Sequence, residues 1–272
     1  MKKSLLLATA LSVASVALLG ACQQDNKAVL DKLAAIDKRL ENIEKKGIGG
    51  GGQPQRPQRP APDPTKTYAV AVDDAPVIGS PNALVTIVKA YEYACPFCEK
   101  ARPTLQQIHE TYGDKVRVVY APFVVHPQTA TLPAQATCAG HRQGKFKEID
   151  ELLWEKVFKA RKFEEETILA LGKDVPGMDA GKYATDLKSK DCEAWVQKHM
   201  QSLSMLGVGA TPAFFINGRF LSGAQPFPAF KTVIDEELKK AEERVAQGTS
   251  ADSYYRTWVV EKGLKKLDAP KP

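Results

Sequence analysis

The 272-residue sequence has few of the residues that metal and nucleic-acid sites need. It has five cysteines and four histidines, with one Cys-x-x-Cys pair, no second such pair and no His-x3–5-His spacing. A zinc site with the usual ligand pattern is therefore not expected. Basic and acidic residues are mixed along the chain, without an Arg/Lys stripe interleaved with aromatics, which argues against nucleic-acid binding. The content of 43% hydrophobic and 26% charged residues is ordinary for a globular protein.

The N-terminal apolar run is too short for a comfortable membrane span. It covers residues 5–19, whereas a spanning helix needs about 20 apolar residues. Two lysines precede it and small residues follow it, so residues 1–21 have the layout of a secretory signal peptide. Small residues directly before Cys22 resemble the bacterial lipobox, whose cysteine is lipidated. We expect Cys22 to anchor the chain on the periplasmic side of a bacterial membrane, and Gln23 favours the outer membrane. The alternative is an ordinary signal peptide followed by a coincidental cysteine.

The next two segments are predicted to be a stalk and a linker. Segment 22–46 is predicted to be a helical stalk that is anchored by the lipid on Cys22. The helix is predicted because apolar residues recur at alternating spacings of four and three, as on the seam of a coiled coil. About three heptads make an isolated oligomer marginal, so residues 23–46 form either a lone amphipathic stalk or a homo-oligomer contact. Segment 47–64 has four consecutive glycines and then five prolines, which predicts a linker. The seam residues are Val29, Leu33, Ile36, Leu40 and Ile43.

Residues 65–272 are predicted to form one α/β domain. A β-rich run, a helical pattern and a second β-rich run follow one another, which predicts a βαβ unit of a parallel sheet. Asn217-Gly218 between two short β-rich runs predicts a hairpin. The predicted strands are 68–72, 84–91, 116–125, 213–216 and 219–222; helices are predicted from the Cys-x-x-Cys pair to 112, within 129–206 with breaks near 140–144 and 172–181, and at 228–246 and 250–266.

The one Cys-x-x-Cys pair, Cys95-Pro96-Phe97-Cys98, lies where the first strand of this unit meets its helix. Such a pair alone can be half of a zinc site, a redox pair or chance. Pro96 suits the first helical turn, which places Cys95 at the helix N-terminus. The helix dipole there stabilises a thiolate, the nucleophile of disulfide exchange. Because the dipole effect is modest and Phe97 has no polar group, we expect Cys95 to be acidic but not extreme, and the disulfide to be a moderate oxidant.

Three stretches of sequence resemble the DsbA-like branch of the thioredoxin superfamily. They are residues 91–98, Gly144-Lys145-Phe146 and residues 207–218, and the resemblance covers about 65–247. It implies a thioredoxin fold with a helical subdomain inserted at about 126–206. It also implies thiol–disulfide exchange with extracytoplasmic proteins.

The resemblance assigns a role to each matching residue. Cys95 is expected to be the exposed nucleophile and Cys98 the buried resolving thiol. Pro212 is expected to be cis, and Thr211 to pair through its backbone with an extended substrate; a plain strand-start proline is the alternative. Glu92 lies near the place where relatives have an acidic residue. It is either a proton relay for Cys98 or a solvated surface residue.

Cys138 and Cys192 remain once Cys22 and the redox pair are assigned. Export implies an oxidising compartment, so we expect a Cys138–Cys192 disulfide. It would close about 55 residues and stabilise the fold by about 4 kcal/mol. The alternative is a second redox centre, although neither cysteine belongs to a Cys-x-x-Cys pair.

The sequence leaves the direction of electron transfer open. The predicted activity is that of an oxidase for exported proteins, with a membrane protein that recycles it. Threonine before Pro212 resembles the isomerase and reductase relatives as much as the oxidases, and oligomerisation through a stalk resembles the isomerases. An isomerase or a reductase is therefore the alternative. A redox-inert peptide-binding or chaperone module is the alternative of another class. No metal, nucleotide or flavin is implied.

Overall fold

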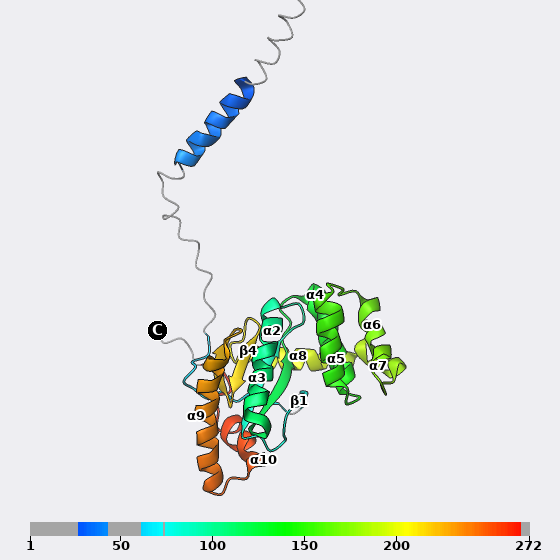
Figure 1. The fold of residues 1–272 in the computed structure, drawn as a ribbon, viewed down its shortest axis with the longest axis vertical. Helices are drawn as coiled ribbons and strands as arrows, with labels where there is room; N and C mark the ends of the chain where they lie inside the picture. The colour runs from blue at the N-terminus through cyan, green and yellow to red at the C-terminus, as the bar shows by residue number, and fades with distance from the viewer. Residues whose placement is uncertain (1–26, 43–60, 73, 268–272) are drawn as a thin grey trace, which may run out of the picture. The chain divides into compact units, whose positions relative to one another are not determined.

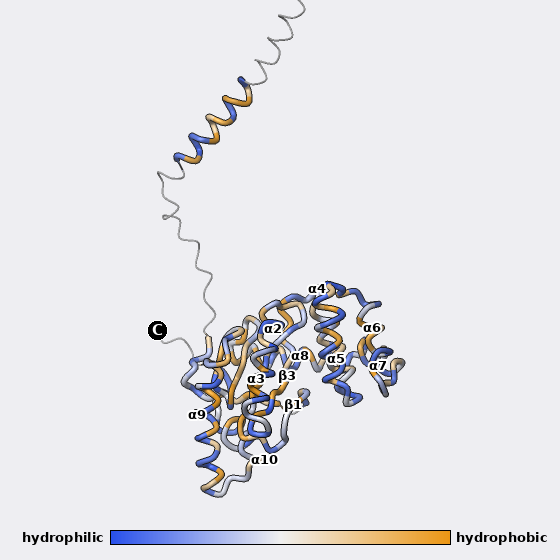
Figure 2. Tube along the Cα trace, viewed as in Figure 1, coloured by the Kyte–Doolittle hydropathy of each residue, from blue (hydrophilic) through white to orange (hydrophobic). Residues whose placement is uncertain are grey.

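The computed structural model describes residues 27–42, 61–72 and 74–267. The chain divides into two units, 1–58 and 59–272. In the first unit, residues 27–42 form a helix in which every residue is exposed, and Figure 2 shows apolar and polar residues interspersed along it. Its exposed apolar side chains are Val29, Leu30, Leu33, Ile36 and Leu40. The predicted signal peptide, Cys22, Ile43 and most of the linker lie outside the described residues.

The second unit has the predicted thioredoxin fold, built on a mixed sheet in the order β1-β3-β2-β4-β5. Strands β2 and β3 are parallel, and the other neighbouring pairs are antiparallel. The helices between β2 and β3 complete the predicted βαβ unit. The strands are β1 (Val77–Ile78), β2 (Val85–Tyr91), β3 (Val116–Pro122), β4 (Ala213–Ile216) and β5 (Arg219–Ser222).

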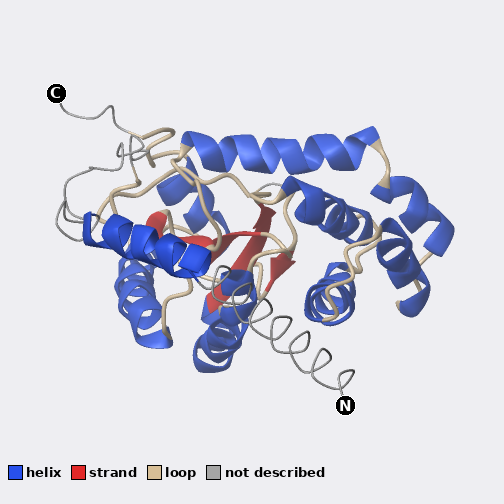
Figure 3. Ribbon diagram, turned by 90° about the horizontal axis from the view of Figure 1, so that it is seen from above, coloured by secondary structure: helices blue, strands red, loops and turns tan. Residues whose placement is uncertain are grey.

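Helices lie on both sides of this sheet (Figure 3). Those flanking the sheet are α2 (Pro96–Lys100), α3 (Arg102–Tyr112), the 3-10 turn η1 (Gly113–Lys115), α9 (Phe227–Ala246), α10 (Ala251–Tyr254) and the π-helical turn η3 (Tyr255–Val260). Those of the segment between β3 and β4 are α4 (Pro127–His141), α5 (Phe146–Leu152), the π-helical turn η2 (Leu153–Lys159), α6 (Glu165–Asp174), α7 (Ala180–Leu187) and α8 (Lys190–Met205). Helices α5, α6 and α7 gather at the end of the domain away from α9 (Figure 1).

The central strand β2 is buried on both faces, because its side chains alternate between two hydrophobic clusters. Val85, Ile87 and Tyr91 belong to the cluster with α3, α9 and the α5–α7 helices. Val88 and Ala90 belong to the opposite cluster, with the end of α8 and with η3. Because β2 is packed on both faces, it fixes the position of the Cys-x-x-Cys pair, which lies shortly after its end.

The Asn-Gly hairpin forms as predicted between β4 and β5. Asn217 has φ +44° and Gly218 has φ +83°, the left-handed conformation that this turn requires. Asn217 is also buried; its Oδ1 accepts from the backbone N–H of Thr86 (2.8 Å) and its Nδ2 donates to the Leu84 carbonyl (2.9 Å). A Cβ on Gly218 would lie 2.5 Å from the Tyr68 carbonyl oxygen. The hairpin therefore fixes β4 against β2.

The predicted strand at 68–72 is wrong. Residues 67 and 68 form only single bridges, to Arg219 and Leu264, because the segment divides its backbone bonds between two partners: the Tyr68 N–H donates to Gly218 and the Ala69 N–H to Leu264. The short strand β1 at the sheet edge was not predicted. Packing of the domain begins before residue 65, since the backbone N–H of Asp63 donates to the Tyr68 hydroxyl (2.7 Å).

The last predicted helix, 250–266, is shorter in the structure. It ends at Val260, because the Leu264 N–H donates to the Thr67 carbonyl (2.9 Å) and leaves the helical path. The helix predicted from the cysteine pair to 112 is divided in the structure: α2 ends at Lys100, Ala101 intervenes and α3 begins at Arg102. Pro103 has no backbone N–H to continue the helical hydrogen bonds at this point.

Candidate active site

Cys95 and Cys98 lie at the start of α2, directly after the end of β2. Cys95 is the N-cap residue in extended conformation, and Pro96 occupies the first helical position. Both cysteines are free thiols, so the structure describes the reduced form. Cys95 is 5% exposed and Cys98 is fully buried, whereas Phe97 between them is 61% exposed. Only Cys95 offers a sulfur to an incoming molecule.

The Thr211–Pro212 peptide bond is cis and lies against this pair. The Sγ of Cys95 is 3.2 Å from the Thr211 carbonyl oxygen, to which the thiol donates. Ala213 begins β4 opposite Ala90 of β2, so the sheet itself brings residue 212 beside the cysteine that follows β2. The four residues that the sequence assigns to exchange and substrate pairing therefore meet at one point.

The two thiols have opposite acidities. Hydrogen bonds from the Cys98 side chain, the Thr211 side chain and the backbone N–H groups of Cys98 and Phe97 outweigh the effect of burial and lower the pKa of Cys95 to about 6. Burial raises the pKa of Cys98 far above its usual range. At neutral pH Cys95 is thus a thiolate and Cys98 a thiol, which makes Cys95 both the attacking and the leaving group of exchange.

A buried cation beneath the pair was missed in the sequence. Lys89 of β2 is 1% exposed. Its Nζ lies 4.9 Å from the centroid of the Tyr91 ring, 5.2 Å from that of Tyr120 and 5.7 Å from that of Trp154, which stabilises the ammonium through cation–π contacts. A lysine inside an apolar β run was the signal that could have identified it, because such a strand is buried on both faces.

Asp150 of α5 is the counter-charge of Lys89. It accepts hydrogen bonds from the Tyr93 hydroxyl (2.6 Å) and from Trp154 Nε1 (3.2 Å). Burial raises the pKa of Asp150 and lowers that of Lys89, and the attraction between the two charges opposes both shifts. The attraction of Lys89 to Cys98 further opposes the shift of Lys89. Lys89 and Asp150 line a cavity of about 510 Å³. Lys89 therefore places a buried positive charge near Cys98, with Asp150 as its counter-charge.

Lys89→Met is expected to make the disulfide a weaker oxidant. Without the ammonium the Cys95 thiolate of the reduced form is less stable, so the equilibrium with glutathione shifts about tenfold toward the disulfide form, which is about 30 mV for a two-electron couple. The measurement is a glutathione redox titration. Lys100→Met, the same change on the exposed side of α2, is the matched control. Equal shifts in the two variants would contradict the assignment.

Glu92 is buried, but its carboxylate contacts the start of α4 rather than Cys98. Oε2 accepts from the backbone N–H groups of Val125 (2.6 Å) and His126 (3.0 Å), and Oε1 bonds to His126 Nδ1. Its effect on Cys98 comes through its backbone alone. Its burial excludes the solvated surface residue that was the alternative, and the proton relay stays a prediction.

Cys138 of α4 and Cys192 of α8 form a disulfide, with their Cα atoms 5.6 Å apart. The bond joins the first and last helices of the segment between β3 and β4. It lies outside the group formed by Cys95, Cys98 and Thr211. In the structure these two cysteines are thus a bridge within the helical segment.

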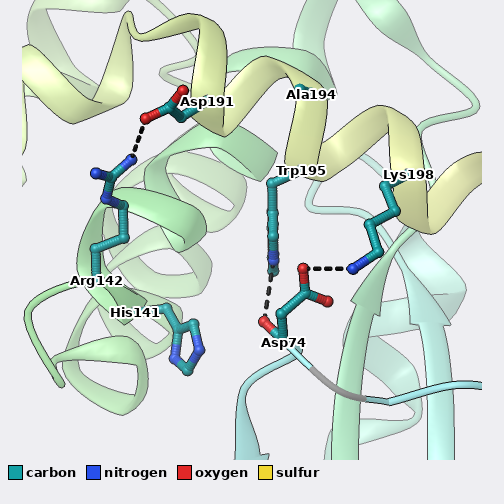
Figure 4. Close-up of a pocket in the computed structure, with 7 residues that line it drawn as sticks. All are labelled: Asp74, His141, Arg142, Asp191, Ala194, Trp195 and Lys198. Carbon is teal, nitrogen blue, oxygen red and sulfur yellow. Dashed lines mark hydrogen bonds and ion pairs between the residues drawn. The ribbon is translucent and has the colours of Figure 1, made fainter.

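A second hollow, of about 550 Å³, lies between α4, α8 and the loop before β1 (Figure 4). The backbone carbonyl of Asp74 accepts from Trp195 Nε1 (3.0 Å), and its carboxylate from Lys198 (2.8 Å). His199 stacks edge-on against Trp195 and has its Nε2 3.4 Å from an Asp74 oxygen, without a hydrogen bond among the described residues. The hollow is lined by Asp74, His141, Arg142, Asp191, Ala194, Trp195 and Lys198.

Burial of His199 predicts a loss of stability in acid. Burial lowers its pKa to about 4, against about 6.5 in an unfolded chain. The unfolded chain thus binds a proton first, so stability is complete above pH 6.5 and falls by about 3 kcal/mol as the pH drops to about 4. Urea unfolding at several pH values should show this slope, and His199→Phe should flatten it. His109→Phe, on the exposed side of α3, is the control and should leave the slope unchanged.

The described residues contain no group of three or more His, Cys, Asp or Glu side chains placed to hold a metal ion. Within the same ranges, no helix is long and apolar enough to cross a membrane.

The chain is similar to several known proteins. A family model described as thioredoxin matches residues 71–236. A probable disulfide bond formation protein D from Bacillus cereus is 28% identical over 174 residues, 60% of this chain and 78% of that protein. A thioredoxin-like oxidoreductase from Silicibacter pomeroyi is 25% identical with a TM-score of 0.55, over 61% of this chain and 94% of that one. BdbD from Bacillus subtilis, in its oxidised form, is 20% identical with a TM-score of 0.59, over 64% and 98%.

Proposed function

Because this chain belongs to the thioredoxin family and is a thiol–disulfide oxidoreductase, we propose that it is an exported oxidase that transfers the Cys95–Cys98 disulfide to extracytoplasmic proteins. A substrate thiolate attacks the Sγ of Cys95, and the Cys95–Cys98 bond breaks with the electron pair moving to Cys98. A second substrate thiolate then attacks the substrate sulfur of the mixed disulfide. Cys95 leaves as a thiolate, and the substrate keeps the new disulfide.

The opposite acidities of the two thiols support this proposal most strongly. A pKa of about 6 makes Cys95 a good leaving group in the last step. It also stabilises the reduced form, which gives the disulfide oxidising power. Cys98, buried and with a raised pKa, recloses on Cys95 when no second substrate thiol arrives. Thr211 and Pro212 supply backbone groups for an extended substrate strand.

The proposed cellular setting comes from the N-terminal sequence. Residues 1–21 direct export, and lipid on Cys22 holds the protein on the periplasmic side of a bacterial membrane, with the outer membrane favoured. The linker at 47–64 separates stalk and domain. A membrane protein with its own redox pair reoxidises Cys95 and Cys98 after each cycle.

Isomerase or reductase activity is the second candidate. Helix 27–42 exposes an apolar stripe, with Leu33 52%, Ile36 51% and Leu40 52% exposed. A second copy of this helix would cover that stripe in a coiled coil. Paired active sites favour isomerisation, since one substrate with two wrong disulfides can meet two reduced Cys95 thiolates.

Refolding assays separate these activities. Reduced, unfolded ribonuclease A should regain its disulfides stoichiometrically with the oxidised protein, whereas insulin with dithiothreitol should be reduced no faster than by dithiothreitol alone. If the reduced protein restores the activity of ribonuclease with scrambled disulfides, and the oxidised protein does not oxidise reduced ribonuclease, the oxidase is rejected in favour of the isomerase. Binding of unfolded substrate without any exchange would favour a redox-inert module.

A further inference from the structure

The buried carboxylate of Glu92 has one cationic partner among the described residues, the ring of His126. The Glu92 side chain is fully buried, whereas that of His126 is 58% exposed. A buried carboxylate is stable only if it is hydrogen-bonded and paired with a positive charge. Two backbone N–H groups supply hydrogen bonds, and the His126 ring bonded through Nδ1 supplies the charge. The arrangement favours the imidazolium form.

This ion pair lies beside the nucleophile. Glu92 precedes Cys95 by three residues, and Ala94 between them packs against a cluster that includes Val124 and Ala130, on either side of His126. The bond from Glu92 raises the pKa of His126, and the negative charge of the Cys95 thiolate raises it further. Coupling between two charges is reciprocal, so a positive His126 must stabilise the Cys95 thiolate in turn.

The dipeptide between the two cysteines supplies no positive charge that could stabilise the Cys95 thiolate. Pro96 and Phe97 have no group that can carry one. The hydrogen bonds to Cys95 come from the backbone and from uncharged side chains. Glu92 bonds to the His126 ring, and the Cys95 thiolate attracts its positive charge.

We propose that Glu92 holds His126 as an imidazolium beside Cys95, and that this imidazolium stabilises the Cys95 thiolate whenever that sulfur attacks or leaves. Glu92 is then a positioning residue that acts through His126. The proposal rests on the exchange reaction proposed above. In its last step the second substrate thiolate forms the substrate disulfide, the bond between Cys95 and the substrate sulfur breaks, and the electron pair stays on Cys95 as a thiolate. The adjacent positive charge attracts this thiolate without a proton transfer.

The test titrates the Cys95 thiolate by its ultraviolet absorbance in the full chain. His126→Gln should raise the pKa of Cys95 and shift the equilibrium with glutathione about three- to tenfold toward the disulfide form, less than for a buried pair because the ring is exposed. His126→Lys restores a positive charge and should recover most of the shift. His109→Gln removes an exposed histidine on α3 and should change nothing. An unchanged titration in His126→Gln would reject the proposal.

A second measurement follows the imidazole itself by NMR. The pKa of His126 should be higher in the reduced protein than in the disulfide form, where the thiolate is absent, and it should fall in Glu92→Gln. An equal pKa of His126 in the reduced and the oxidised protein would show that the imidazolium does not interact with the Cys95 thiolate, and it would overturn the proposal even if Glu92→Gln folds poorly.

These readouts are independent of catalysis. If the wild-type chain oxidises no substrate, but the pKa of Cys95 rises in His126→Gln and the pKa of His126 is higher in the reduced protein, the proposed function is rejected and the ion pair is retained. If the wild-type chain oxidises substrate and neither pKa changes in this way, the ion pair alone is rejected.

Discussion

Replacing Cys95 by serine is expected to reduce disulfide exchange to the uncatalysed rate. Cys95 is the N-terminal cysteine of α2, its pKa is lowered to about 6, and its sulfur lies 3.2 Å from the Thr211 carbonyl. A serine hydroxyl stays protonated at neutral pH and forms no mixed disulfide. The measurement is the rate of oxidation of a reduced substrate peptide by the oxidised wild-type protein and by Cys95→Ser.

Cys98→Ser provides the complementary result. Cys98 is fully buried, so it cannot attack a substrate but can release one bound to Cys95. In its absence mixed disulfides on Cys95 should accumulate and appear as covalent complexes on non-reducing gels. Equal trapping by Cys95→Ser and Cys98→Ser, or exchange that survives in Cys95→Ser, would contradict the assigned roles.

Removing the Cys138–Cys192 bridge is expected to cost about 4 kcal/mol of folding stability. The bond links positions 54 residues apart, and a loop of that length loses chain entropy of about this size in the unfolded state. For a domain of this size the midpoint of thermal unfolding should fall by about 8–16 °C. The paired variant Cys138→Ala with Cys192→Ala, in which no free thiol remains at either position, is the variant to unfold by urea and by heat.

The same variant separates a structural bridge from a second redox centre. Oxidation of a substrate peptide at a temperature where the variant is folded should match the wild type, because the bridge lies outside the group of Cys95, Cys98 and Thr211. A variant of unchanged stability that has lost oxidase activity would contradict the structural role.

Local sequence patterns predicted much of the fold, because the determinants of those elements are short in range. The Asn217-Gly218 turn requires left-handed backbone that Asn and Gly accept, and β4 and β5 have the predicted bounds. Pro103 removes a helical hydrogen bond, and the helix breaks just before it. The segment at 68–72 failed because its partners, Gly218 and Leu264, are distant in sequence and no local pattern encodes them.

The chemistry of the site was only partly predictable, for the same reason. The Cys-x-x-Cys pair and the Thr-Pro dipeptide are local motifs, and a resemblance identified them. The counter-charge of Lys89 comes from Asp150 in another helix, and the partner of Glu92 is His126 beyond β3. Which buried charge meets which partner depends on tertiary packing, so the sequence left Glu92 open between a proton relay and a solvated surface residue.

The most direct test of the account equilibrates the full chain in glutathione redox buffers and maps the state of each cysteine by mass spectrometry. We predict that Cys95 and Cys98 titrate together at about −120 to −180 mV, the range of dithiol oxidants and isomerases, while Cys138 and Cys192 stay bonded throughout. A potential below about −230 mV, near the range of thioredoxin-type reductants, would contradict the oxidase. Titration of Cys138 and Cys192 in the same window would contradict the division of the cysteines into one exchanging pair and one structural bridge.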